Sequence, residues 1–235
     1  MAFVYAVLGG GRQGTAAAYD MAKFGDAAQV LIADLSLEAA HKSAARVNHL
    51  VGKEIAQAHQ LNVTDHDQLC DFLSHVNSFL SAVPYWHNPA ITRAAIEAGA
   101  CMTDLGGNTD LVRDQIELTA QAKGADIAII PDCGQVPGMG TSLTVYAMSL
   151  LDETEEIMMW DGGNPLLPKP PFNYILTFNI AGLTNEYYGV ANFIRNGQIK
   201  QVPTFKEEDY EIVEFPEPIG RMEAFVAGGG TSTMP

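Results

Sequence analysis

A glycine-rich segment near the start of the chain has the spacing of a phosphate-binding loop. Gly9, Gly11 and Gly14 fit the pattern G-x-G-x-x-G, which is typical of dinucleotide-binding proteins. The first glycine permits a tight turn, the second lets the backbone approach a pyrophosphate, and the third lets the next helix pack closely. Arg12 and Gln13 lie where that helix begins, and its free N–H groups would attract the phosphates.

An aspartate follows at the distance that such a loop requires. Asp34 comes about 20 residues after the loop and ends an apolar run. Its carboxylate would accept hydrogen bonds from the adenosine ribose and repel a 2′-phosphate. Leu35 comes next, with no arginine beside it, so the sequence predicts NAD in preference to NADP. The alternative is a simple glycine turn followed by an aspartate that caps a helix.

Further cofactor contacts are expected where other strands end. Ligands of parallel sheets bind at the carboxyl edge of the strands. The residues that follow the third, fourth and fifth expected strands are Asn62, Val63, Ala82, Val83, Pro84, Leu105 and Gly106. Ordinary strand-to-helix loops are the alternative at each of these positions.

Three ionisable or polarisable residues follow the last two expected strands. Asp104 follows the fifth strand, and it could pair with a substrate ammonium or cap its own loop. Asp132 and Cys133 begin a glycine-rich turn before a helix, whose N-terminus would favour an anion or a thiolate. We predict these three as catalytic candidates. The alternative is that Asp132 satisfies backbone N–H groups and Cys133 fills space.

The elements that must position these residues alternate along the chain up to about residue 150. Strands are expected at 3–8, 29–33, 55–60, 78–82, 100–103 and 127–130, with helices near 12–24, 36–50, 65–75, 88–98 and 109–123. Such alternation predicts a parallel sheet with helices on both faces. We therefore expect an α/β fold, a Rossmann doubly wound parallel sheet, with an NAD-binding domain over residues 1–150.

The pattern changes after residue 150. Glycines and prolines between 162 and 171 predict a loop. Strand-like runs follow at 174–180, 198–202, 210–215 and 223–227, with a helix near 187–196. Residues 151–235 are therefore expected to form a second, incomplete α+β domain that is rich in sheet and serves substrate binding and dimerisation.

Composition excludes several other classes of protein. The 235 residues are 47% hydrophobic with a formal net charge of -15, which opposes nucleic-acid binding. No apolar run reaches the roughly 20 residues of a membrane span, and the apolar start lacks a basic leader. The cysteines Cys70, Cys101 and Cys133 form no Cys-x-x-Cys pair. We expect no metal site, no disulfide and a cytoplasmic location.

Several motifs together resemble the saccharopine dehydrogenase superfamily. They lie at residues 9–14, 104–108, 134–138 and 228–232. Within that superfamily, the segments at 162–165, 170–174, 186–187 and 196–197 are most similar to lysine 6-dehydrogenase. Members of the superfamily continue past the last of the shared motifs, so the resemblance implies that this chain is truncated at its C-terminal end.

The resemblance implies NAD-dependent oxidative deamination of the ε-amino group of L-lysine, by a protein that is a homodimer. This reaction requires a base, a carboxylate that steadies an iminium and an anion-binding group. Asp104 and Asp132 are candidates for the first two roles, and Arg221 or Thr231 for the third. The pocket walls are predicted at Tyr174 and Tyr187. The alternatives are a saccharopine dehydrogenase-type C–N oxidoreductase and a non-catalytic NAD-binding module.

Overall fold

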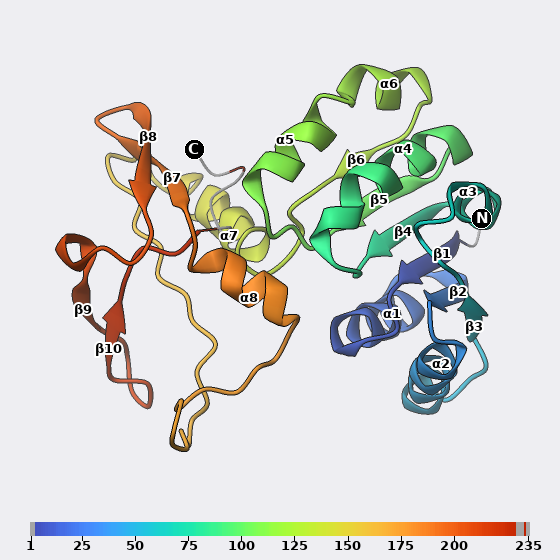
Figure 1. Cartoon of the computed structure of the whole chain (residues 1–235), viewed down its shortest axis with the longest axis horizontal. Coiled ribbons are helices and arrows are strands. Elements are labelled where there is room, and N and C mark those ends of the chain that lie inside the picture. Colours follow the sequence, from blue (N-terminus) through green and yellow to red (C-terminus); the bar gives the residue numbers. More distant parts are fainter. Residues whose placement is uncertain (1–2, 229–232, 234–235) are drawn as a thin grey trace. The chain divides into compact units, whose positions relative to one another are not determined.

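The computed structural model describes residues 3–228 and residue 233 of the chain. Its first part contains a six-stranded sheet (Figure 1), in which all neighbouring strands are parallel. The order along the sheet is β3-β2-β1-β4-β5-β6, which is the order of the Rossmann fold. The strands are β1 (Phe3–Leu8), β2 (Ala27–Asp34), β3 (Ala56–Gln60), β4 (Ser78–Ser81), β5 (Cys101–Asp104) and β6 (Ile129–Ile130). The predicted fold class is confirmed.

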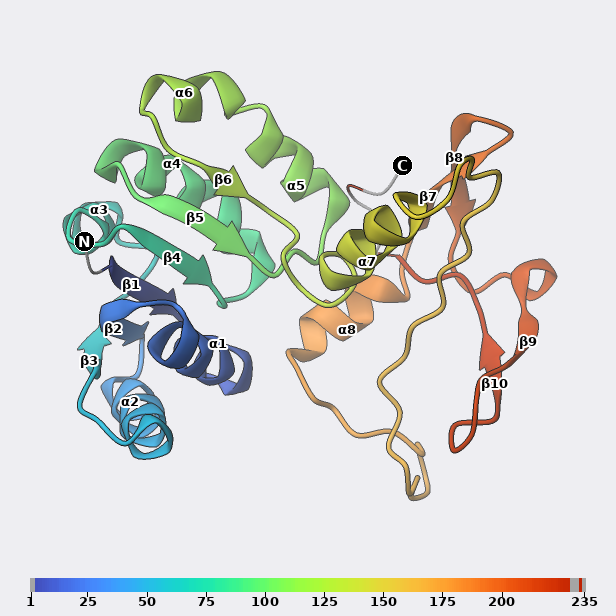
Figure 2. The same cartoon turned by 180° about the vertical axis from the view of Figure 1, so that it is seen from behind.

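Helices follow the strands and cover the sheet. They are α1 (Arg12–Phe24), α2 (Leu37–Val51), α3 (His66–Leu73), the short η1 (Tyr85–His87), α4 (Asn88–Ala98), α5 (Thr109–Ile116) and α6 (Thr119–Gly124). Opposite views show α1 and α2 near one another, with α3 and α4 forming a separate pair (Figures 1 and 2). The helix expected near 109–123 is divided into α5 and α6.

Alternating side chains of the central strand hold the two helix pairs on opposite faces. Leu8 is fully buried in one apolar cluster with Leu69 of α3 and Ile91 of α4. Val7 points the other way, into a second cluster with Val47 of α2. Because successive side chains of a strand point to opposite faces, this division is what a doubly wound sheet requires.

The chain forms two compact units. The first comprises residues 1–106 and 110–133, and the second comprises residues 107–109 and 134–235. The second unit contains α7 (Met139–Met148), α8 (Ile180–Glu186), η2 (Glu207–Asp209) and two antiparallel hairpins, β7 (Val190–Arg195) with β8 (Gln198–Pro203) and β9 (Glu211–Glu214) with β10 (Arg221–Ala224). The main segment of the second unit begins at residue 134, before α7 and not at residue 151. The division of function between residues 1–150 and 151–235 stays a prediction.

Two of the secondary-structure predictions for the second unit are wrong. The segment 174–180 forms no strand and leads into α8, and the segment expected as a helix near 187–196 contains strand β7. The cause is the turn after β7, where Asn196 and Gly197 have φ of 53° and 71°. Such Asn-Gly pairs form the two-residue turns of β-hairpins. Strands β7 and β8 therefore pair, beginning with Arg195 opposite Gln198 next to the turn.

No helix in the described part of the chain is long and apolar enough to cross a membrane.

Candidate functional site

The glycine loop between β1 and α1 has the geometry that a phosphate-binding turn needs. Gly9 has a φ of 106°, and a Cβ there would lie 2.7 Å from the backbone oxygen of Ala82. A Cβ at Gly14 would collide with the carbonyl oxygen of Gly9. A Cβ at Gly11, in contrast, would have no heavy atom within 4 Å. The first and third glycines are therefore required by packing, and the second faces open space.

The start of α1 suits an anionic ligand. Gly11 is the N-cap residue and offers no side chain to the first N–H groups of the helix, which leaves their partial positive charge for a ligand. Arg12 and Gln13 form the first turn and are exposed. The loop therefore has the geometry expected of a pyrophosphate-binding turn, and its contact with a dinucleotide stays a prediction.

Asp34 lies at the end of β2 and connects this loop to the next one. Its Oδ2 accepts the N–H of Gly10 at 2.8 Å, and its Oδ1 accepts the N–H of Ser36 at 2.9 Å. The N-cap of α2 is Ser36, whose hydroxyl accepts the N–H of Ala39 at 3.3 Å. Asp34 is therefore not the cap of that helix. Its half-buried carboxylate keeps lone pairs that could accept ribose hydroxyls.

The other predicted cofactor residues lie in loops that follow the strands. Asn62 accepts the N–H of Thr64 at 3.0 Å in a tight turn after β3, and Gly106 has a φ of 70° after β5. The remaining positions are Leu35 after β2, Val63 after β3, Ala82, Val83 and Pro84 after β4, and Leu105 after β5. Parallel strands end at one edge, so these loops share that edge with the glycine loop. Their contact with a cofactor stays a prediction.

Asp104 is fully buried and holds two loops together. Its Oδ1 accepts the N–H groups of Gly106 at 2.8 Å and Asp132 at 3.2 Å, and its Oδ2 accepts Nε2 of Gln115 at 2.8 Å. Burial raises the pKa of Asp104, and these hydrogen bonds act in the opposite direction. The geometry favours a positioning role, and proton transfer by Asp104 stays a prediction.

The other two catalytic candidates lie beside Asp104. Asp132 is buried with a φ of 60°, and Cys133 donates its backbone N–H to the carbonyl of Asp104 at 2.7 Å. The Cys133 side chain is exposed overall, with Sγ 3.4 Å from the carbonyl oxygen of Ile130. Desolvation, then Asp104 and Asp132, raise the pKa of the Cys133 thiol. This opposes a thiolate at neutral pH. The predicted catalytic roles of both residues stay predictions.

The second unit contains an acidic and aromatic cluster, of which the sequence predicted only the two tyrosines as site residues. Burial, and then the nearby charge of Asp161, raise the pKa of Glu186 to about 7. Burial raises the pKa values of Tyr174 and Tyr187, and Glu186 adds to both shifts. The predicted pocket residues Tyr174 and Tyr187 are thus brought into electrostatic contact with Glu186, a carboxylate poised to exchange protons near neutral pH.

In the sequence, Glu186 was identifiable only as part of the segment 186–187 that is similar to lysine 6-dehydrogenase. Its position at the end of α8 next to Tyr187 was the available signal. The ring of Tyr187 packs edge-on against Phe205 at 5.1 Å, which limits its movement. Arg221 lies on β10, where its Nε is 3.8 Å from Oε1 of Glu214. Thr231 lies outside the described residues. The anion-binding roles of both stay predictions.

Comparisons with known proteins bear on the family and the fold. A family model described as the saccharopine dehydrogenase NADP binding domain matches residues 5–130. The structure is similar to apo saccharopine dehydrogenase (L-Glu forming) from Saccharomyces cerevisiae, with a TM-score of 0.64 and 20% identity over 95% of this chain. The chain spans 49% of that protein, which is about half its length.

Weaker likenesses cover a smaller share of the chain. Quinate dehydrogenase from Corynebacterium glutamicum, in complex with NAD, matches with a TM-score of 0.43 and 17% identity over 62% of this chain and 50% of its own. A probable dehydrogenase from Thermotoga maritima matches with a TM-score of 0.44 and 19% identity over 63% of this chain and 41% of its own.

The family model covers more than half of the chain, including the glycine loop and Asp34. The predicted resemblance to the superfamily is therefore confirmed, and the first unit is a nicotinamide-dinucleotide-binding domain with an oxidoreductase fold. The protein belongs to the saccharopine dehydrogenase NADP binding domain family.

Proposed function

We propose that the protein is an NAD-dependent oxidoreductase that oxidatively deaminates the ε-amino group of L-lysine. The observation that carries this proposal is the Glu186 cluster. A carboxyl group whose pKa is raised to about 7, with Asp161 as a second acid nearby, suits the binding and deprotonation of an ammonium group. An ammonium must lose a proton before hydride can leave the adjacent carbon, so such a base is what the chemistry requires.

The preference for NAD is supported by Asp34. Asp34 is the last residue of β2, which pairs with β1, the strand that leads into the glycine loop. Its carboxylate would repel the 2′-phosphate of NADP. The name of the matching family model refers to NADP. Cofactor preference therefore needs its own measurement, and we propose NAD on the charge at this position.

We assign each of these residues a role in binding or in catalysis. Bound NAD supplies the hydride acceptor, and the glycine loop orients it. Glu186 takes the proton from the substrate ammonium, and Tyr174 and Tyr187, which lie near Glu186, form the walls around the amine. Hydride loss leaves an iminium, which water converts to an aldehyde and ammonium. Asp104 holds the loops, and a neighbouring carboxylate such as Asp132 would steady the positive charge.

A saccharopine dehydrogenase-type reaction is the main alternative. Its larger substrate carries more carboxylates and would need more anion-binding groups. Of the basic residues in this region, Lys206 pairs with Glu208 at 3.3 Å and Arg221 lies 3.8 Å from Glu214. These acidic partners oppose the binding of additional carboxylates, which favours the smaller substrate. We propose a homodimer as the assembly that acts on it.

The test is NADH formation by the purified protein with L-lysine, saccharopine and L-ornithine, each with NAD and with NADP. We expect turnover with L-lysine and NAD, lost in Glu186→Gln and kept in the control Glu208→Gln, whose carboxylate is exposed. Turnover with saccharopine but not with lysine would establish the alternative. NAD binding without turnover of any substrate would contradict both enzymatic proposals.

A further inference from the structure

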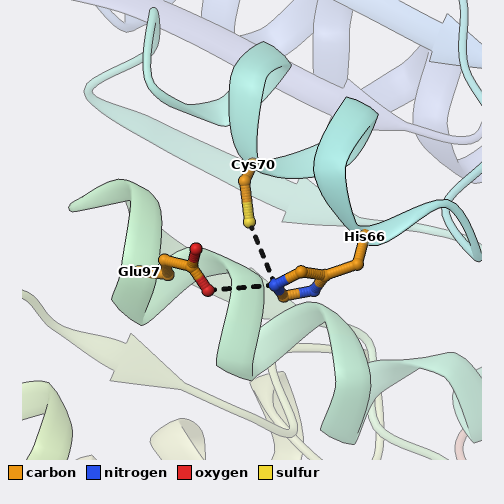
Figure 3. Close-up of side chains that lie close together, drawn as sticks. All are labelled: His66, Cys70 and Glu97. Carbon is orange, nitrogen blue, oxygen red and sulfur yellow. Dashed lines mark hydrogen bonds and ion pairs between the residues drawn. The ribbon is translucent and has the colours of Figure 1, made fainter.

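Three side chains with metal-binding atoms lie close together within the first unit, on helices other than the one that follows the glycine loop. His66 and Cys70 lie four residues apart on α3, so they share one face of that helix. Glu97 lies near the end of α4, which packs against α3. Figure 3 shows the imidazole, the thiol and the carboxylate pointing toward one another.

The distances among these atoms leave room for a zinc ion after a small shift of the carboxylate. Nε2 of His66 is 3.5 Å from Sγ of Cys70 and 2.9 Å from Oε2 of Glu97, and one ligand atom of each residue lies within 4.8 Å of the others. Zinc bonds of about 2.0–2.3 Å place tetrahedral ligand atoms roughly 3.3–3.6 Å apart. The nitrogen and sulfur already have this spacing, and the carboxylate would retreat slightly as the ion replaces its hydrogen bond to the imidazole.

We propose that His66, Cys70 and Glu97 form a zinc-binding site with its fourth position open to water. A thiolate, a neutral imidazole and a carboxylate are the nitrogen, sulfur and oxygen ligands that zinc accepts, and the sulfur disfavours magnesium and calcium. A thiolate and a carboxylate together also balance the charge of a divalent ion.

The surroundings support a cation at this position. The side chains of His66 and Glu97 are 50% and 65% exposed, so an ion from solvent can reach them. The carboxylates of Glu97 and Asp67 lie near the Cys70 sulfur, and their negative charge favours a cation there. The site would also link α3 to α4, since its ligands come from both helices.

The sequence predicted no metal site because it contains no Cys-x-x-Cys pair. The four-residue spacing of His66 and Cys70 was a visible signal, since it places two ligands on one helical face. Glu97 was not predictable as the third ligand, because only the packing of α4 on α3 brings it near.

The test is titration of the chelator-treated full chain with Co²⁺, followed by displacement with Zn²⁺ in competition with a chromophoric chelator. We expect one ion per chain and a sulfur-to-cobalt charge-transfer band. Cys70→Ser should abolish the band, and His66→Asn should weaken zinc binding by about 100-fold or more, since even residues behind the ligands contribute roughly 10–100-fold. Mg²⁺ should not compete.

Matched controls keep the result specific. Cys101→Ser and His75→Asn change the same residue types elsewhere in the first unit and should leave the band and the affinity unchanged. A second readout is the thermal midpoint, which zinc should raise in the unaltered chain but not in Cys70→Ser. No cobalt band, or a zinc affinity that is equal in the unaltered chain, Cys70→Ser and His66→Asn, would overturn the proposal.

Discussion

Replacing Asp34 by asparagine should weaken NAD binding and reduce the preference for NAD. The substitution keeps one acceptor oxygen and the shape of the side chain but removes the charge. Hydrogen bonds to charged acceptors contribute about 1.5–3 kcal/mol and those to neutral acceptors about 0.5–1.5 kcal/mol. Loss of charge at two ribose hydrogen bonds therefore costs roughly 2–3 kcal/mol, which is roughly 30–150-fold in the dissociation constant.

The effect on NADP should be opposite in sign. A neutral side chain at residue 34 no longer repels the 2′-phosphate, so NADP should bind more tightly to Asp34→Asn than to the unaltered chain. Isothermal titration of both cofactors against both proteins gives the four constants that are needed. The hydrogen bonds of Asp34 to the N–H groups of Gly10 and Ser36 also weaken, so the thermal midpoint should fall modestly.

A matched control separates recognition from folding. Asp65 accepts the N–H of Gln68 at 3.1 Å as the cap of α3, a similar backbone contact that does not involve the glycine loop. Asp65→Asn should lower the thermal midpoint and leave NAD affinity unchanged. A preference of the unaltered chain for NADP, or a change in NAD affinity of less than about threefold in Asp34→Asn, would refute the role of Asp34 in ribose recognition.

Other substitutions and conditions test different parts of the molecule. Gly14→Ala should lower the free energy of unfolding by about 1–3 kcal/mol in denaturant titration, because its Cβ meets the carbonyl of Gly9. The kcat/KM for lysine should rise with pH through about 7 as Glu186 loses its proton; an unchanged profile in Glu186→Gln would remove it as the base. Because the folded-state pKa of Glu186 is raised from 4.5 to about 7, its contribution to stability is full below about 4.5 and is lost as the pH rises through about 7. Thermal melts should show that loss in the unaltered chain and not in Glu186→Gln. Cys133 should react with iodoacetamide more slowly at neutral pH than an unperturbed thiol, since its pKa is raised, and mass spectrometry of tryptic peptides would measure that rate.

The first unit was predictable because its signals are local and repeated. Strand β1 begins and ends where its apolar run does, at Phe3 and Leu8. Asp34 was identifiable because helix α1 and strand β2 fix its distance from the glycine loop. Helix α2 begins one residue after Ser36, a capping residue that the sequence displays. Each of these features depends on neighbours in the chain.

The second unit was less predictable because its structure depends on contacts between distant residues. The aromatic run from Tyr174 favours a strand by composition, yet it pairs with no strand among the described residues. The raised pKa of Glu186 arises from burial and from Asp161, which is distant in sequence. The turn at Asn196 and Gly197 was a readable hairpin signal that the helix prediction overlooked.

The most direct test of the proposed reaction uses L-lysine that carries deuterium at the ε-carbon. Incubation of the protein with this substrate and NAD, followed by mass spectrometry of the reduced cofactor, reports where the hydride originates. We predict NADH that is heavier by one deuterium, formed more slowly than with unlabelled lysine. Unlabelled NADH, or no NADH from lysine at any pH around the raised pKa of Glu186, would contradict the proposal.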